Sequence, residues 1–299
     1  MIGISGKKSG FVALVGRPNV GKSTLLNQMV GSKIAIMSDK PQTTRNRIRG
    51  ILTREEGQII FLDTPGIHKP RTKIGEYMMK VVDQSIREVD LILFLIDVGK
   101  GILKGDEEII QRLQGISIPK LLVLNKIDRV NPESLLPLID RLRQYSFKEL
   151  IPVSALNGNN VEHLIETIYQ YLPEGPYYFP PDQISDQPEQ FLVGELIREK
   201  ALFRLREEVP HSIAVEVEEY TERADGTLYI RAVLYCERES QKGILIGKQG
   251  SMLKEIGRAA REEIELLFST KVYLDLWVKV KEDWRNREGI LRQLGFRDE

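Results

Sequence analysis

Five short runs of mostly aliphatic residues constrain the fold of this chain more than any other feature of its sequence. The runs are Phe11–Val15, Ile59–Asp63, Leu91–Asp97, Leu121–Asn125 and Ile151–Ser154, with amphipathic stretches between them. Near-continuous apolar runs of this length are typical of strands buried on both faces, which occur in parallel sheets connected by helices. We therefore predict an α/β fold with a mostly parallel sheet.

Several of these runs end in a polar residue, among them Asp63, Asn125 and Ser154. In open α/β sheets, ligands bind in the crevice beyond the carboxyl ends of the strands. We therefore expect these three side chains to point toward one crevice.

A proline-rich segment divides the chain. Residues 172–190 read LPEGPYYFPPDQISDQPEQ, and their five prolines cannot continue a helix or an interior strand. We interpret residues 173–190 as a linker between a first domain, 1–172, and a second domain, 191–299. The second domain shows the order helix, strand, strand, helix, helix, strand, followed by a C-terminal helix over Glu282–Leu294, which is typical of a smaller α+β domain.

The composition excludes several classes of protein. The longest apolar stretch, Leu91–Ile96, is far too short to span a bilayer, and residues Met1–Gly10 contain no apolar core of a secretion signal. The single cysteine, Cys236, leaves no intramolecular disulfide, which suits a reducing compartment. We expect a cytoplasmic protein.

Charge is clustered rather than evenly spread. The chain has 43 Lys and Arg against 43 Asp and Glu, a net charge of zero, which argues against a globally basic nucleic-acid binder. Yet Ser240–Arg261 holds five basic residues against the single acidic residue Glu255. This stretch is a local basic cluster.

The first loop after a predicted strand carries a phosphate-binding pattern. Residues 16–23 read GRPNVGKS, and a helical pattern follows. The glycines let backbone N–H groups at a helix N-terminus face phosphate oxygens, while Lys22 reaches the β- and γ-phosphates and the Ser23 hydroxyl ligates Mg²⁺. A glycine-rich turn with a solvated lysine is the alternative interpretation.

Two further segments fit a switch that senses a γ-phosphate. In residues 63–66, DTPG, the Asp63 carboxylate can hold Mg²⁺ through water and the Gly66 N–H can approach the γ-phosphate. Between this segment and the first loop lies PQTTR, in which either Thr43 or Thr44 could ligate Mg²⁺ when the γ-phosphate is present. We favour Thr44.

The sequence after the fourth predicted strand favours guanine. Residues 125–128 read NKID, and the Asp128 carboxylate can accept hydrogen bonds from the ring N–H and the exocyclic amine of guanine, which adenine does not offer. Ser154 and Ala155 follow the next strand, where a backbone N–H could reach guanine O6. An ATPase or kinase with the same phosphate loop is the alternative, and Asp128 argues against it.

The basic cluster of the second domain surrounds a glycine-rich loop. Residues 243–250 read GILIGKQG between two helical patches. A G-x-x-G loop lets a nucleic-acid backbone approach closely, Lys248 adds a phosphate partner, and Ile244 and Ile246 could form the floor of the groove. Two helices joined by a glycine turn would be the structural alternative.

Taken together, these motifs resemble the Era family of GTPases. The resemblance rests on GRPNVGKSTLLN, DKPQTTR, DTPGIHKP, NKID and PVSA, and it covers essentially the whole chain because the second domain is similar to the type II KH domain of that family. It implies a P-loop GTPase domain and a KH domain, with GTP or GDP and Mg²⁺ as cofactors.

The motifs and the resemblance assign four sets of residues. Nucleotide binding is expected of Gly16, Asn19, Val20, Gly21, Lys22, Ser23, Thr24, Asp63, Thr64, Pro65, Gly66, Asn125, Lys126, Asp128, Ser154 and Ala155. Mg²⁺ ligation is expected of Ser23, Thr44 and Asp63, and hydrolysis is expected to depend on Lys22, Asn19, Thr44 and Gly66. RNA binding is expected of Gly243, Ile244, Ile246, Gly247, Lys248, Gln249, Gly250 and Lys254.

One position departs from the pattern of Ras-like GTPases. Ile67 follows Gly66, where those proteins place a glutamine that orients the attacking water. In relatives of Era, a K⁺ ion bound by an asparagine of the phosphate loop supplies positive charge, and Asn19 is the matching residue. We therefore expect slow hydrolysis that K⁺ stimulates.

The resemblance also implies partners. These are ribosomal RNA of the small subunit near its 3′ end and the small ribosomal subunit itself, whose assembly or maturation the protein would serve as a monomer. Reversible contact with the inner face of the cell membrane is a further implication. A GTP-controlled protein or membrane adaptor without RNA binding is the alternative function.

Overall fold

The computed structural model describes residues 6–297. Residues 1–5 and 298–299, which the predicted domains include, lie outside this range. The expected absence of a secretion signal rests on Met1–Gly10, and half of that segment therefore lies outside the described residues. The chain forms two compact units. The first comprises Met1–Ala35, Thr44–Lys69 and Met78–Asp186, and the second Ile36–Thr43, Pro70–Tyr77 and Gln187–Glu299.

The first unit is built on a six-stranded sheet with the order β2-β3-β1-β4-β5-β6. All neighbouring strands are parallel except β2, which is antiparallel to β3. The strands are β1 (Lys8–Gly16), β2 (Ile48–Arg54), β3 (Gly57–Asp63), β4 (Leu91–Asp97), β5 (Lys120–Asn125) and β6 (Glu149–Val153). The prediction of an α/β fold with a mostly parallel sheet is confirmed, and the only strand of this sheet that the sequence did not predict is β2.

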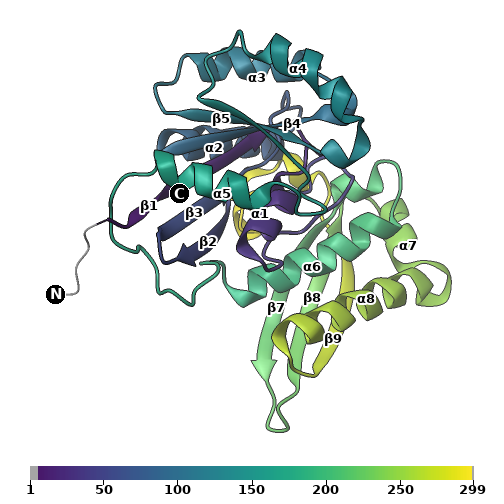
Figure 1. The fold of residues 1–299 in the computed structure, drawn as a ribbon. Coiled ribbons are helices and arrows are strands. Elements are labelled where there is room, and N and C mark those ends of the chain that lie inside the picture. The colour runs from purple at the N-terminus through teal and green to yellow at the C-terminus, as the bar shows by residue number, and fades with distance from the viewer. Residues whose placement is uncertain (1–5, 298–299) are drawn as a thin grey trace. The chain divides into compact units, whose positions relative to one another are not determined.

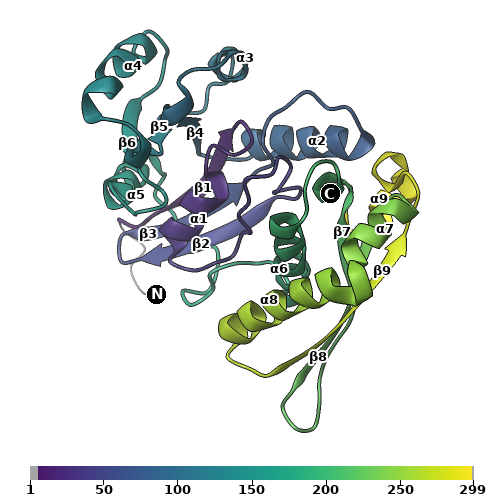
Figure 2. The same cartoon turned by 90° about the vertical axis from the view of Figure 1, so that its right-hand side faces the viewer.

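Helices cover both faces of this sheet (Figures 1 and 2). The helices are α1 (Lys22–Val30), α2 (Lys73–Arg87), α3 (Lys104–Gln114), α4 (Leu135–Leu142) and α5 (Val161–Tyr171). Apolar residues of α2, α3 and α4 share one core with the strands, and α1 and α5 pack on the opposite face. Phe61 and Phe94 are fully buried within the sheet. Because these strands are parallel, the carboxyl ends of β1, β3, β4, β5 and β6 lie at the same edge of the sheet.

The proline-rich segment is attached to the first unit along much of its length. Gln58 of β3 accepts hydrogen bonds from the backbone N–H groups of Tyr178 and Phe179, at 2.8 and 2.9 Å. Ile51 of β2 donates to the carbonyl of Ile184 at 2.9 Å. Residues 173–186 therefore extend the first unit, and the second unit resumes at Gln187. The limits 1–172 and 191–299 for separate domains stay a prediction.

The second unit contains a three-stranded sheet with the order β7-β8-β9, in which β7 and β8 are antiparallel and β8 and β9 parallel. Its elements are α6 (Glu189–Arg204), β7 (Ala214–Glu222), β8 (Leu228–Cys236), α7 (Glu239–Ile246), α8 (Ser251–Phe268), β9 (Val272–Val280) and α9 (Glu288–Gln293). The predicted order of helices and strands is confirmed. Figure 2 shows α6 and α8 side by side along the sheet.

The predicted C-terminal helix over Glu282–Leu294 is wrong in extent. The chain instead forms a short 3-10 turn at Trp284–Asn286 and then α9. Asp283 adopts a left-handed conformation with φ 52°, and Trp284 is fully buried with its Nε1 donating to the Ser212 carbonyl at 2.7 Å. A helix through this point would carry Trp284 away from that partner.

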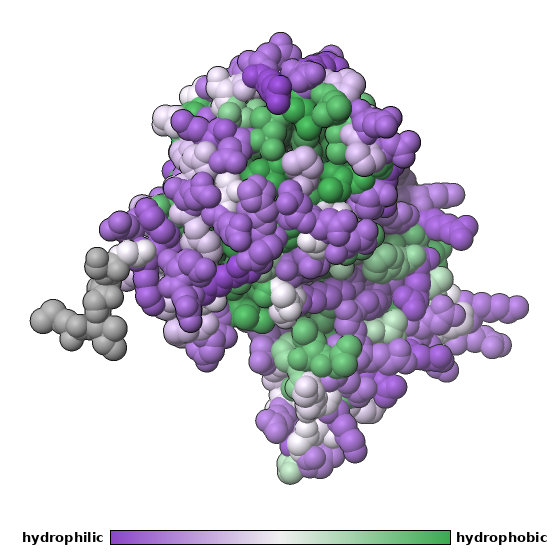
Figure 3. Space-filling model, viewed as in Figure 1, coloured by the Kyte–Doolittle hydropathy of each residue, from purple (hydrophilic) through white to green (hydrophobic). Residues whose placement is uncertain are grey.

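The surface is hydrophilic over most of the face seen in Figure 3, with hydrophobic side chains gathered around α3 and α4. Leu136 of α4 is 64% exposed. Within residues 6–297, no helix combines the length and the apolar character that a membrane span requires.

Candidate functional site

The phosphate loop joins β1 to the N-terminus of α1. Gly21 caps this helix in a left-handed conformation with φ 100°. A Cβ at this position would lie 2.2 Å from Asn125 Nδ2, so only glycine fits both the conformation and the space. Val20 is buried and Thr24 lies half-buried in the first turn of α1. The loop therefore presents the free N–H groups of a helix N-terminus beyond the sheet.

Lys22 is buried beneath this loop. Its Nζ donates to the carbonyl oxygens of Gly16 at 3.3 Å and Arg17 at 3.1 Å. Burial lowers the pKa of Lys22 to about 8, against the opposing attraction of Asp63. Removal from water disfavours the ammonium ion, and a bound anion would restore the balance in its favour. The site thus favours an anionic ligand.

Three oxygen-bearing side chains converge beside Lys22. Ser23 Oγ donates to Asp63 Oδ2 at 2.6 Å and lies 3.0 Å from Thr44 Oγ1. Thr44 Oγ1 is 3.4 Å from the same carboxylate oxygen. The neighbouring Thr43 instead donates to the Lys40 carbonyl at 2.6 Å. Of the two threonines left open by the sequence, the structure brings Thr44 to the cluster.

This cluster fits a hard divalent cation. Asp63 Oδ1 is buried and has no hydrogen-bond partner among residues 6–297. Burial raises the pKa of Asp63, and Lys22 and the Ser23 hydroxyl oppose that shift. Mg²⁺ prefers hydroxyl and carboxylate oxygens. Ser23, Thr44 and Asp63 together supply that donor set.

Gly66 approaches the phosphate loop closely. A Cβ on Gly66 would lie 2.6 Å from the backbone nitrogen of Pro18, and the next residue, Ile67, donates its N–H to the Gly16 carbonyl at 3.0 Å. The Ile67 side chain packs against the core. Thr64 Oγ1 donates to the Leu14 carbonyl at 2.7 Å, so this hydroxyl ties the segment to β1.

The predicted base-reading residues are connected across β5 and β6. Asn125 Nδ2 donates to the Val20 carbonyl at 2.8 Å, and Asn125 Oδ1 accepts from the Ala155 N–H at 3.0 Å. Ser154 Oγ donates to Asp128 Oδ1 at 2.5 Å. The structure therefore brings all of these residues to the end of the sheet where the phosphate loop lies.

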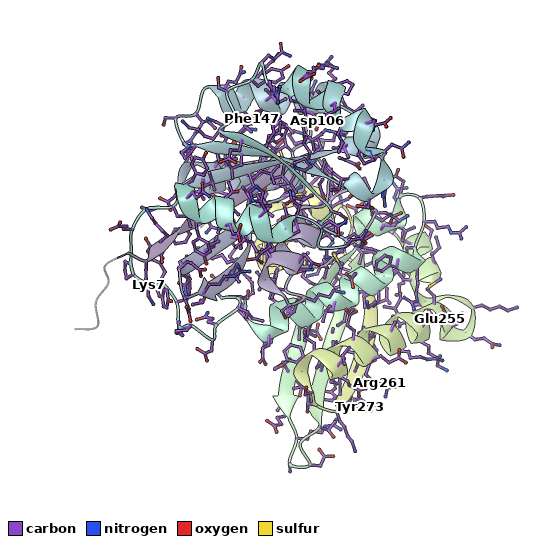
Figure 4. All side chains as sticks on the ribbon, viewed as in Figure 1. Lys7, Asp106, Phe147, Glu255, Arg261 and Tyr273 are labelled. Atoms are coloured by element: carbon purple, nitrogen blue, oxygen red, sulfur yellow. The ribbon has the colours of Figure 1, made fainter. Side chains whose placement is uncertain are left out.

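Two polar contacts at this edge were not predicted. Lys126 Nζ donates at 2.7 Å both to the Asn19 carbonyl and to Asp97 Oδ2, so Asp97 holds the lysine that supports the phosphate loop. Arg17 Nε pairs at 2.8 Å with Asp106, which lies at the start of α3 (Figure 4). Asp97 could have been found, because it is the last residue of a predicted buried strand. Asp106 gave no such signal.

The glycine-rich loop of the second unit lies between α7 and α8. Gly247 and Gly250 have φ angles of 72° and 78°, and a Cβ at Gly247 would lie 2.7 Å from that of Met252. Lys248 and Gln249 are exposed. The loop is therefore fixed in a conformation that a ligand backbone can approach.

An apolar residue and a basic helix face adjoin this loop. Ile244 is 49% exposed and Ile246 half-buried, whereas Leu245 between them is in the core. On α8, Lys254 is exposed, and so are Arg258 and Arg261, which were not predicted as ligand contacts. The spacing of four and seven residues places the three on one face of the helix. Figure 4 labels Arg261 on α8.

Comparison with known proteins gives matches to both units. Residues 11–126 match the family model described as a 50S ribosome-binding GTPase, and residues 208–285 match the model of a KH domain. Two solved structures are similar over nearly the whole chain, each with 46% sequence identity, a TM-score of 0.94 and coverage of 97% of this chain and 99% of the other. One is a variant of the Aquifex aeolicus Era protein bound to GDP and AlF4⁻. The other is Era in complex with MgGDPNP and nucleotides 1506–1542 of 16S ribosomal RNA.

The lowered pKa of Lys22 predicts that nucleotide binding takes up a proton. At pH 8 about half of the buried amines are neutral, because the pKa is about 8, and bound phosphates restore the charged form. GDP affinity should therefore weaken as pH rises through 8. Calorimetry with Mg·GDP at pH 8, in buffers of different ionisation enthalpy, should show uptake of about half a proton. The same titration at pH 7 should show much less, and the absence of any buffer dependence at pH 8 would contradict the role of Lys22.

Proposed function

Since this chain belongs to the Era family of GTPases, we propose that it is a GTP-hydrolysing switch that binds small-subunit ribosomal RNA near its 3′ end and acts in assembly or maturation of that subunit. The observation that carries the enzymatic part is the convergence of Ser23, Thr44 and Asp63 beside the buried Lys22. The relative bound to 16S ribosomal RNA supports the RNA part.

The residues of the first unit divide the work of holding Mg·GTP. In this proposal, Lys22 and the N–H groups of the phosphate loop bind the β- and γ-phosphates, and the Gly66 N–H approaches the γ-phosphate. Ser23, Thr44 and Asp63 hold Mg²⁺, which would neutralise charge that develops on the phosphates. Asp128 accepts the guanine N–H groups. Asn125 Oδ1 accepts a hydrogen bond from the Ala155 N–H and so holds Ala155 beside the base-binding site.

Thr44 makes the site a switch. Its hydroxyl belongs to the Mg²⁺ donor set, yet it lies on a segment that joins two units. Ligation by Thr44 would be favoured when a γ-phosphate is bound, and its loss would release the segment.

The position after Gly66 holds Ile67 rather than a water-orienting glutamine. The Ile67 side chain packs against the core and offers no hydrogen bond to water. We propose that K⁺ held at Asn19, whose φ of 64° sets the turn of the phosphate loop, supplies positive charge near the transferring phosphoryl group.

The K⁺ proposal predicts a cation-dependent rate. Wild-type protein should hydrolyse GTP about tenfold faster in K⁺ than in Na⁺ at equal ionic strength, a lowering of the barrier by about 1.4 kcal/mol. Asn19→Ala should remove most of that difference, and the ratio of the rates in K⁺ and Na⁺ is compared within each protein because the left-handed turn at Asn19 also shapes the phosphate loop. Equal turnover in the two salts, unaffected by Asn19→Ala, would show that Asn19 binds no cation of catalytic importance.

RNA binding is assigned to the glycine-rich loop and the basic face of α8. Gly243, Gly247 and Gly250 would let the RNA backbone approach, while Lys248 and Lys254 pair with phosphates and Ile244 contacts a base. Arg258 and Arg261 extend the same face. Gln249, with φ 52°, completes the turn of the loop.

The RNA proposal predicts a loss of binding that spares GTP hydrolysis. Lys248→Glu replaces a phosphate partner with a repelling charge, and we expect the affinity for a single-stranded 3′-end oligonucleotide to fall at least about tenfold. The exposed Lys271, immediately before β9, offers a matched control, because Lys271→Glu makes the same charge change away from the loop. Fluorescence anisotropy measures both.

Basal GTPase activity of the two variants should equal that of the wild type. If Lys248→Glu binds the oligonucleotide as tightly as the wild type does, the second unit binds RNA elsewhere or not at all, and the adaptor function gains support. The expected cytoplasmic location rests on the composition, whereas the expected monomeric state and reversible contact with the inner membrane face rest on the family resemblance.

A further inference from the structure

A short segment between helix α1 and Thr44 folds with the second unit. Residues 36–43 precede Thr44 and group with residues 187–299 rather than with the parallel sheet. Ile36 is only 1% exposed and lies in the apolar core that α6 and the three-stranded sheet build. This isoleucine therefore anchors the segment to the second unit.

Two buried charged residues of α6 hold the backbone of this segment at its two ends. Glu199 Oε1 accepts a hydrogen bond from the Met37 N–H at 2.8 Å. Arg198 donates from Nη2 to the Thr43 carbonyl and pairs with Glu195. Arg198 is 2% exposed and Glu199 is 1% exposed.

Buried charges of this kind are costly unless they are paired and hydrogen-bonded. Arg198 and Glu199 each have a charged partner on α6 itself, Glu195 and Lys200 respectively. Beyond packing, these side chains hydrogen-bond the backbone of residues 36–43 and so fix its position. Apolar residues would cover the same surface without fixing the position of Met37 and Thr43.

The hydrogen bond from Arg198 holds Thr43, the residue immediately before Thr44. Consecutive Cα atoms are about 3.8 Å apart, so the position of the Thr43 carbonyl limits where the next residue can lie. Thr44 is that residue, and its hydroxyl contacts Ser23 and Asp63. The same helix, α6, packs along α8, which carries the basic face.

We propose that Arg198 and Glu199 are positioning residues for GTP hydrolysis, which hold residues 36–43 so that Thr44 reaches the Mg²⁺ site. This inference rests on the proposed function. It adds that α6, through these two side chains, makes the Thr44-dependent state of the nucleotide site sensitive to RNA bound at α8. In this proposal, residues 36–43 connect the nucleotide site to the RNA-binding unit in addition to the proline-rich linker.

The test compares the full-length wild type with Arg198→Ala and with the matched control Arg204→Ala. Arg204 lies on the same helix, and its own contacts are the Lys200 carbonyl and Glu255. Affinities for Mg·GDPNP and Mg·GDP are measured with fluorescent nucleotide analogues. Hydrolysis is measured with and without the 3′-end oligonucleotide.

Arg198→Ala should weaken GDPNP binding or hydrolysis about tenfold, within the usual range of coupling between sites, while GDP affinity stays within about twofold. GDP lacks the γ-phosphate that Thr44 ligation accompanies, so the ratio of the two affinities reports Thr44 rather than general stability. The effect of RNA on hydrolysis should shrink in Arg198→Ala and persist in Arg204→Ala. Arg198→Lys keeps the charge with fewer donors and should be intermediate.

A folded Arg198→Ala protein with a wild-type ratio of GDPNP to GDP affinity and wild-type hydrolysis overturns the inference. So does a variant that only melts earlier or loses RNA affinity with that ratio unchanged, since that outcome shows a structural role alone. If Arg198→Ala does not fold, Glu199→Gln and Arg198→Lys decide by the same ratio. Failure of the wild type itself to hydrolyse GTP or bind RNA would instead contradict the proposed function.

Discussion

The burial of one ammonium and one carboxylate at the same sheet edge sets the chemistry of the first unit. Lys22 and Asp63 are both removed from water. Burial lowers the pKa of Lys22 and raises the pKa of Asp63, which favours the neutral form of each side chain. Such a pair is held at a cost that a bound anion and a bound cation can offset. The phosphate loop above Lys22 and the hydroxyls beside Asp63 supply sites for both. The pair therefore suits a magnesium-bound phosphate chain.

The register of the parallel sheet positions the residues of this arrangement. Strands β1 and β3 deliver the phosphate loop and Asp63 side by side in register, and β5 and β6 deliver the base-reading residues to the same edge. Lys126 ties the two halves together by bridging Asp97 and the Asn19 carbonyl. In the second unit, a buried apolar core fixes α6 and α8, and the loop with two glycines at positive φ and the basic face of α8 are built on these helices.

Much of this structure can be predicted from the sequence, because strands buried on both faces leave unmistakable apolar runs and the phosphate loop has a fixed spacing. Strand β2 was missed because Arg49, Gly50 and Arg54 interrupt its apolar pattern at the edge of the sheet. The attachment of the proline-rich segment depends on Gln58, whose side chain pairs with backbone groups about 120 residues away. No local pattern reports such a contact. The place of residues 36–43 was hidden for the same reason, since Ile36 is a single apolar anchor whose partners lie in a different part of the chain.

The guanine preference of the first unit is tested most directly by competition between Mg·GTP and Mg·ATP for the purified full-length protein. In the proposed site, Asp128 would accept from the ring N–H and the exocyclic amine of guanine, and a site built on such polar partners rejects a base without them by roughly 10⁴-fold. GTP should therefore displace a bound fluorescent GDP at concentrations where ATP has no effect, and Asp128→Ala should lose most of that preference. Displacement by ATP at concentrations similar to those of GTP would contradict the assignment of the site.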